Sequence, residues 1–328
     1  MRLTATLAQG SKMTAMPTES RLFRTILCPI DFSKPSRQAL RYAALLAARS
    51  QGRLVAIYIE DPMLAAAAAI EYDEKTLLDK GRAQLRRLVD RTAAAYGLPM
   101  KSTTIEVTVG KPHEEIARMS ERLDCDLIVM GSHGWTGANR VVLGSTTHRV
   151  LRQSSLPVLA TPPSGASGPS RAWPGKWAIA PVDLEPRDSA DSVAAAVAAQ
   201  ELGVRLQLVH VVEPIADIPW LEFDEARRNQ QRHRKALAEL TKLKEELAWA
   251  VTECRVAAGK PAEQIAKLAS AAAVGLIIMT RRSGQGFFGP RQGSISYEVL
   301  TRAKTAVLAL PSDKKWQSRA ASLAPKRG

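Results

Sequence analysis

Cysteine is scarce in this chain, and its placement argues against two classes of protein. The three cysteines, Cys28, Cys125 and Cys254, lie far apart and form no CxxC pair. They fit neither a disulfide framework nor a zinc site, and they suit a reducing compartment such as the cytoplasm. Long apolar runs are also missing, since the longest candidates, 64–70 and 193–199, fall well short of the ~18 residues that a membrane-spanning helix needs. The sequence therefore predicts a cytoplasmic protein with no membrane span.

Aromatic residues make up only 5% of the chain, although the chain is strongly basic. Lys and Arg number 46 against 32 Asp and Glu, which gives a net charge of +14. Such an excess of positive charge can favour the binding of nucleic acid, an anionic membrane or an anionic ligand. The aromatic residues are scattered rather than interleaved with the basic ones, which argues against a base-stacking platform. We therefore do not expect nucleic acid as a partner.

Several motifs of enzymes are absent as well. The sequence has no GxxxxGK[ST] and no HExxH, and its five histidines have no obvious Ser or Cys nucleophile nearby. Residues 284–289 match GxGxxG, but Pro290 follows and the next predicted helix begins only near Ser294. A dinucleotide fingerprint needs the helix to open within the motif. We therefore predict no catalytic residue and expect the protein not to be an enzyme.

What the sequence does contain is an internal duplication. Five blocks recur in the same order, 152 residues apart at first and 149 later, for example "GKPHEEIA" from Gly110 and "GKPAEQIA" from Gly259. Each copy alternates short apolar runs with helical patterns, which indicates βαβ units and a parallel sheet covered on both faces. In the first copy we expect strands near 25–30, 53–59, 103–109, 126–130 and 157–161.

The repeats divide the 328 residues into five parts. Residues 1–20 are predicted to be a disordered leader, with Met13 or Met16 as alternative starts. The first domain covers 21–162, a Pro-, Gly- and Ser-rich linker covers 163–176, and the second domain covers 177–312. Residues 313–328 carry five basic residues against Asp313 and are predicted to be a disordered basic tail.

The most informative segment of the first copy is a glycine-rich loop between a buried strand and a helix. Its spacing is Gly131-x2-Gly134-x9-Gly144-Ser145. The first two glycines allow a close approach of the backbone to a ligand. Gly144 and Ser145 offer free amides at a helix N-terminus, where the dipole favours an anion. Such a loop at the carboxyl edge of a parallel sheet predicts phosphate binding.

These residues resemble the ATP-binding signature of the universal stress protein family. The segments "PIDFS" (Pro29 to Ser33), "GKPHEEI" (from Gly110) and "DLIVMGSHG" (from Asp126) resemble that family too. The resemblance covers both copies, and tandem domains are an arrangement known in the family. It implies an α/β fold of two tandem doubly wound five-stranded parallel sheets, Rossmann-like, and a stress-response protein that binds ATP. It also implies pairing of the two copies through their last strands, while a homodimer of whole chains stays open.

The resemblance also assigns site residues in the first copy. Asp31 would contact the nucleoside, Pro29 would line the adenine end, and Ile59 would offer backbone contacts to the adenine. The wall near ribose and phosphates would consist of Met130, Gly131, Ser132, His133 and Gly134. The phosphates would be held by Gly144, Ser145 and Thr146. A magnesium ion is expected to accompany ATP, and no carboxylate is clearly its ligand.

The second copy departs from this pattern. Thr280 and Ser283 replace the first glycine pair, and Arg281 and Arg282 stand between them, whereas Gly293-Ser294 and Asp183 are retained. The long cationic side chains would either clamp a phosphate or fill the crevice. We expect this copy to bind ATP weakly or not at all and to serve as a degenerate pairing partner.

Two other functions stay open at this point. One is an adenine-nucleotide-using enzyme, whether a slow ATPase or an adenylating enzyme. Slow ATP hydrolysis or autophosphorylation also stays open, because Ser145, Thr146 and Thr147 would lie beside the phosphates. The other is a nucleotide-independent interaction module whose contact surface is the long charged helix predicted near 222–248. Bound adenine nucleotide in the purified protein would favour the ATP-binding stress protein over the interaction module, and fast multiple turnover of ATP would favour the enzyme.

Overall fold

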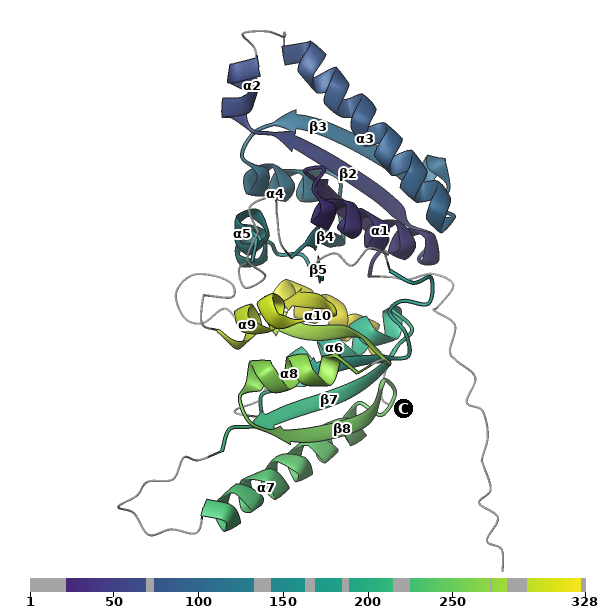
Figure 1. Ribbon diagram of the computed structural model, residues 1–328. Helices are drawn as coiled ribbons and strands as arrows, with labels where there is room; N and C mark the ends of the chain where they lie inside the picture. The colour runs from purple at the N-terminus through teal and green to yellow at the C-terminus, as the bar shows by residue number, and fades with distance from the viewer. Residues whose placement is uncertain are drawn as a thin grey trace, which may run out of the picture.

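A computed structural model describes residues 22–68, 74–132, 143–162, 169–184, 189–214, 225–271, 273–281 and 294–325. The predicted leader, 1–20, and the 284–289 motif lie outside these ranges. The described residues form two α/β halves that follow each other along the chain (Figure 1).

The first half has five strands in the spatial order β3-β2-β1-β4-β5, all parallel. Its elements are β1 (Thr25–Ile30), α1 (Lys34–Arg49), β2 (Arg53–Glu60), α2 (Pro62–Ala68), α3 (Glu74–Tyr96), the 3-10 helix η1 (Met100–Ser102), β3 (Thr103–Val109), α4 (Pro112–Arg122), β4 (Leu127–Gly131), α5 (Ser145–Gln153) and β5 (Val158–Thr161). The inner strands β1, β4 and β5 are almost entirely apolar because helices cover both faces of the sheet, whereas the edge strand β3 is more polar. The short helix α2 had no counterpart in the sequence prediction.

The second half repeats this order as β8-β7-β6-β9-β10. Its elements are β6 (Trp177–Pro181), α6 (Ser189–Glu201), β7 (Arg205–Val212), α7 (Glu225–Glu246), β8 (Val251–Ala258), α8 (Pro261–Ala269), β9 (Val274–Arg281), α9 (Ile295–Arg302), β10 (Ala306–Pro311) and α10 (Lys314–Leu323). The predicted fold class, two tandem doubly wound α/β units with five parallel strands each, is confirmed.

The two halves join along their last strands. Strands β5 and β10 run antiparallel, with Leu159 opposite Leu308, so the ten strands form one sheet. Both strands are fully buried, as apolar edge strands must be to avoid open pairing with other chains. The apolar core on one face continues from Ile128 of β4 through Val158 of β5 to Val307 of β10.

The C-terminal segment corrects a prediction. Instead of a disordered basic tail, residues 314–323 form helix α10, which packs on α6. Asp313 caps the helix by accepting a hydrogen bond from the main-chain N–H of Trp316 at 2.8 Å. The Trp316 side chain is only 4% exposed and Ala320, one turn later, is fully buried. The charge count masked this pattern, because an Asp cap followed by apolar residues four apart is a helix signal.

The part of the linker nearest the second half is docked rather than extended. Trp173 packs edge-on against Tyr42 of α1, with ring centroids 4.8 Å apart. Its indole N–H donates to the carbonyl oxygen of Gly275 in β9 at 2.8 Å. The main-chain oxygen of Trp173 accepts a hydrogen bond from Arg49. One buried indole therefore contacts an element from each half.

The buried thiols lead to a first prediction. Cys28 is fully buried in β1 and Cys125 is 5% exposed, whereas Cys254 in β8 is partly exposed. Burial, helped by Asp126, raises the pKa of the Cys125 thiol to about 12, and burial raises that of Cys28 as well. Because the thiolate is the reacting species, we expect a thiol reagent at pH 8 to label one cysteine per folded chain quickly. Peptide mapping should identify it as Cys254, and rapid labelling of Cys28 would contradict the described core.

Candidate functional site

A cavity of about 260 Å³ opens where β1, β2 and β4 end and α5 begins. It lies at the junction of β1 and β4, where the order of strands along the chain reverses, and β2 contributes Ile57 and Ile59 to its wall. Open α/β sheets bind ligands at such switch points. Its lining residues are Pro29, Ile30, Asp31, Ser33, Ser36, Ile57, Ile59, Pro112, Ile116, Met130, Gly131, Gly144, Ser145, Thr146 and Thr147.

The structure brings together eight of the eleven residues predicted for the site. Those that line the cavity are Pro29, Asp31, Ile59, Met130, Gly131, Gly144, Ser145 and Thr146. Ser132 is buried, with 3% of its surface exposed, and is not among the lining residues. Its main-chain N–H donates to Thr161 at 3.1 Å, and its carbonyl accepts from the N–H of Gly144 at 2.9 Å. Ser132 therefore links the loop ends to the sheet, and His133 and Gly134 lie outside the described residues.

Several lining residues were missed by the sequence analysis. Thr147 was expected to lie beside the phosphates but was not assigned as a binding residue. It fixes α5 to the sheet, because its hydroxyl donates to the carbonyl of Gly131 at 2.7 Å. Ser33 and Ser36, at the start of α1, also line the cavity. Ile57 belongs to the apolar run of β2, and Ile116 is a buried apolar position of the amphipathic helix α4; for both, only burial was predictable. Alternation along β2 places Ile57 on the same side as Ile59, and this was the available signal.

Asp31 is exposed at the cavity rather than used as a helix cap. The cap of α1 is Ser33, whose side chain accepts from the N–H of Ser36 at 3.2 Å. Asp31 accepts from the N–H of Ser33 at 3.0 Å, which orients its carboxylate. Between them Phe32 has φ of 59°, a left-handed conformation that residues other than glycine adopt rarely. Such strain persists where surrounding structure enforces it, often beside ligands.

The start of α5 is open to an anion. Its cap position is Gly144, and among the described residues no side chain caps the helix. The first amides of α5 therefore face the cavity with the positive end of the helix dipole. In the second half Ser294, which repeats Ser145, caps α9 by accepting from the N–H of Tyr297 at 3.2 Å. The two halves thus differ at the position expected to bind phosphate.

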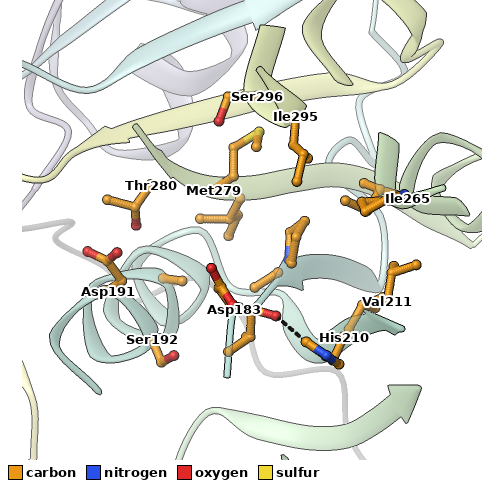
Figure 2. A pocket seen from close by; sticks show the side chains of 17 residues that line it. Asp183, Asp191, Ser192, His210, Val211, Ile265, Met279, Thr280, Ile295 and Ser296 are labelled. Atoms are coloured by element: carbon orange, nitrogen blue, oxygen red, sulfur yellow. Dashed lines mark hydrogen bonds between the residues drawn. The ribbon is translucent and has the colours of Figure 1, made fainter. Parts of the chain in front are cut away.

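A second cavity, of about 250 Å³, occupies the equivalent place in the second half (Figure 2). Asp183, which repeats Asp31, lines it together with a further carboxylate, Asp191 of α6. Apolar side chains such as Ile265 and Ile295 lie across from these carboxylates in Figure 2. No Lys or Arg occurs among its described lining residues.

Arg281 corrects the expectation for the second copy, because it does not line this cavity. Its guanidinium instead donates to main-chain oxygens at the far end of α5, those of Leu151, Ser154 and Leu156. The side chain is buried, and burial lowers the pKa of the guanidinium to about 10, opposed by nearby Asp313. It is still charged at neutral pH. Arg282, Ser283 and Gly293 lie outside the described residues.

Fold and cavity together define a class: tandem, doubly wound α/β domains, each with a ligand-sized cavity at the carboxyl edge of its sheet. The family model for the universal stress protein family matches residues 22–162 and 179–311. The chain therefore belongs to the universal stress protein family and carries its domain twice. The predicted family resemblance is confirmed.

Relatives agree with this assignment. A universal stress protein of Methanocaldococcus jannaschii is 32% identical over 142 residues, which are 42% of this chain and 81% of that protein. A universal stress protein of Mycolicibacterium smegmatis is 24% identical over 295 residues, 87% of this chain and 96% of that protein. The crystal structure of a universal stress protein from Archaeoglobus fulgidus has a TM-score of 0.65 at 18% identity and covers 90% of this chain and all of its own. That last likeness concerns the fold.

The described residues contain neither a membrane-spanning helix nor a cluster of metal ligands. None of the described helices is both long and apolar enough to cross a membrane. Within the same ranges, no three His, Cys, Asp or Glu side chains are grouped so that they could hold a metal ion.

Proposed function

We propose that the first half binds ATP and that nucleotide occupancy regulates this protein in a stress response. The observation that carries the proposal is the composition of the first cavity. It has an exposed carboxylate, Asp31, at the end of β1 and the uncapped start of α5 on another wall. A nucleotide presents matching groups, namely hydroxyls on the ribose and anionic oxygens on the phosphates.

Different residues would bind different parts of the nucleotide. Asp31 would accept hydrogen bonds from the nucleoside. The adenine would lie between Pro29 and the apolar side chains of the cavity, where the backbone of Ile59 would contact it. The amides of Ser145 and Thr146 would donate to phosphate oxygens, favoured by the helix dipole. A magnesium ion would lower the charge of the phosphates. Its remaining ligands would be water or the hydroxyls of α5, since these oxygens suit a hard cation.

The second half is proposed to be a degenerate copy that pairs with the first. Two features support weak ATP binding there: the α9 cap is supplied internally by Ser294, and the cavity contains two carboxylates that repel phosphate. The antiparallel ladder between β5 and β10 supports pairing within one chain. Three free thiols among the described cysteines are compatible with the cytoplasm as the compartment.

A calorimetric titration tests both parts of the proposal. We expect the full chain to bind one ATP with magnesium present and to bind adenosine more weakly, because adenosine lacks the groups that α5 would contact. Two equivalent ATP sites per chain would contradict the degenerate second half, and no binding at millimolar ATP would contradict the proposal itself. Rapid multiple turnover of ATP in the same samples would favour the enzyme over the regulator.

A further inference from the structure

We propose that Arg281, from the second half, is a positioning residue for the phosphate-binding helix of the first half. This inference rests on the proposed function, because it assigns the anion site to the start of α5. It differs from that proposal in stating that the site is completed by a side chain from the other repeat.

The geometry places the guanidinium at the end of α5 remote from the cavity. Helix α5 has nine residues and begins at Ser145, which lines the cavity. Beyond its last turn, the Arg281 Nη2 atom lies 2.9 Å from the oxygen of Ser154 and 3.0 Å from that of Leu156. The Nη1 atom donates to the oxygen of Leu151 inside the helix. The guanidinium of Arg281 thus binds both the last turn of α5 and the loop that leads to β5.

These contacts have an electrostatic consequence for the whole helix. The last carbonyls of a helix have no partner within it, and a cation beside them is stabilising. A helix as short as α5 is marginal without tertiary contacts. Because the Arg281 side chain is only 6% exposed, solvent screens it little and competes little for these carbonyls. A planar guanidinium also presents its donors in a rigid fork, whereas the donors of an ammonium rotate on a flexible stem.

Two further contacts make α5 a rigid connection between the halves. In its middle, His148 packs edge-on against Tyr297 of α9, with ring centroids 5.7 Å apart. At its start, Thr147 donates to Gly131 at 2.7 Å. The helix is therefore held by β4 of the first half at the cavity and by the second half at its middle and far end. A shift at the far end would move the amides that face the cavity.

Only the second half supplies such an arginine to the other half. The repeat equivalent of Arg281 is Ser132, 149 residues earlier, whose side chain is too short to reach α9 in the same way. The neighbouring Thr280 replaces Gly131 and lines the second cavity. The second copy has thus lost a glycine of the binding loop at the place where it supplies a guanidinium to its partner. This gives the degenerate copy a function in the site of the first.

Ligand binding by Arg281→Met and Arg281→Lys tests the inference. We expect Arg281→Met to weaken ATP binding by about tenfold, within the usual range of coupling between sites, while adenosine affinity changes less than about twofold. Arg281→Lys, which keeps the charge but loses the fork, should fall between. Arg234→Met, an exposed arginine of α7 at the far end of the second half, is the matched control and should change neither affinity.

Hydrogen exchange of the unliganded protein separates this inference from the proposed function. Amides 149–153 of α5 should exchange faster in Arg281→Met than in the wild type, whether or not the wild type binds ATP. Unchanged exchange, unchanged ATP affinity, or an equal loss of ATP and adenosine binding would each overturn the positioning role. If Arg281→Met does not fold, Arg281→Lys supplies the same two measurements. Absence of ATP binding in the wild type would count against the proposed function alone.

Discussion

Replacing Ser145 with aspartate should lower the affinity for ATP by at least about 100-fold without destabilising the protein. The new carboxylate would stand in the first turn of α5, at the wall of the cavity where phosphate oxygens are expected. Two unit charges about 4 Å apart interact by about 4 kcal/mol at the effective dielectric constant of a protein surface. The same carboxylate is favourable at a helix N-terminus, by about 0.5 kcal/mol.

This combination is what makes the variant informative. Ser145 is exposed, so an aspartate there stays solvated and loss of binding cannot be attributed to a damaged core. Titration with ATP and with adenosine would measure the effect, and adenosine affinity should fall far less. Thermal unfolding should show an unchanged or higher midpoint. Full ATP affinity in a folded Ser145→Asp protein would exclude α5 as the phosphate site.

The repeat provides the matched control. Ser294 follows Ser145 by 149 positions and caps α9 in the second half. Aspartate is as good a cap as serine, so Ser294→Asp should fold normally and bind ATP as the wild type does. An equal loss in both variants would mean that the two halves share the nucleotide, contrary to the asymmetry proposed here.

The sequence was sufficient for the features that depend on local pattern. Apolar runs separated by helical periodicity predicted the parallel strands, and the repeat predicted that both halves share one order. The glycine spacing directed attention to the start of α5, and Asp31 and Ile59 followed from the resemblance. These site residues lie at or follow the carboxyl ends of parallel strands. Because parallel strands all end at the same edge of the sheet, their place in the fold could be predicted from the sequence.

The features that depend on contacts between the halves were not predictable in the same way. Arg281 was expected to face its own cavity, but the antiparallel pairing of β5 with β10 brings the last turn of α5 within its reach. The guanidinium points toward carbonyl groups that need a hydrogen-bond donor. Which carbonyl groups lie within its reach depends on the tertiary structure and cannot be read from the sequence. Trp173 illustrates the same limit, since its segment has the composition of a linker and yet its indole is buried.

Gly275 lies directly against that docked segment, and Gly275→Ala should destabilise the protein by about 3 kcal/mol, the upper end of the usual cost of overpacking. A Cβ atom there would lie 1.8 Å from the carbonyl oxygen of Pro174 and 2.6 Å from its carbonyl carbon. Both are backbone atoms, so no flexible side chain can move aside. The first repeat has Asp126 at this place, and its carboxylate accepts from the N–H groups of Arg24 and Thr25.

The repeat therefore explains why glycine is needed in the second copy: the space that a side chain fills in the first is occupied by the backbone of the linker. Urea unfolding followed by circular dichroism would measure the loss. Gly97→Ala is the control, because Gly97 has φ of 73° and a Cβ there would meet nothing within 4 Å. That variant should lose only the cost of a left-handed alanine, about 1 kcal/mol. An equal loss of stability in the two variants would mean that the linker is not packed against Gly275. It would also contradict the buried position of Trp173.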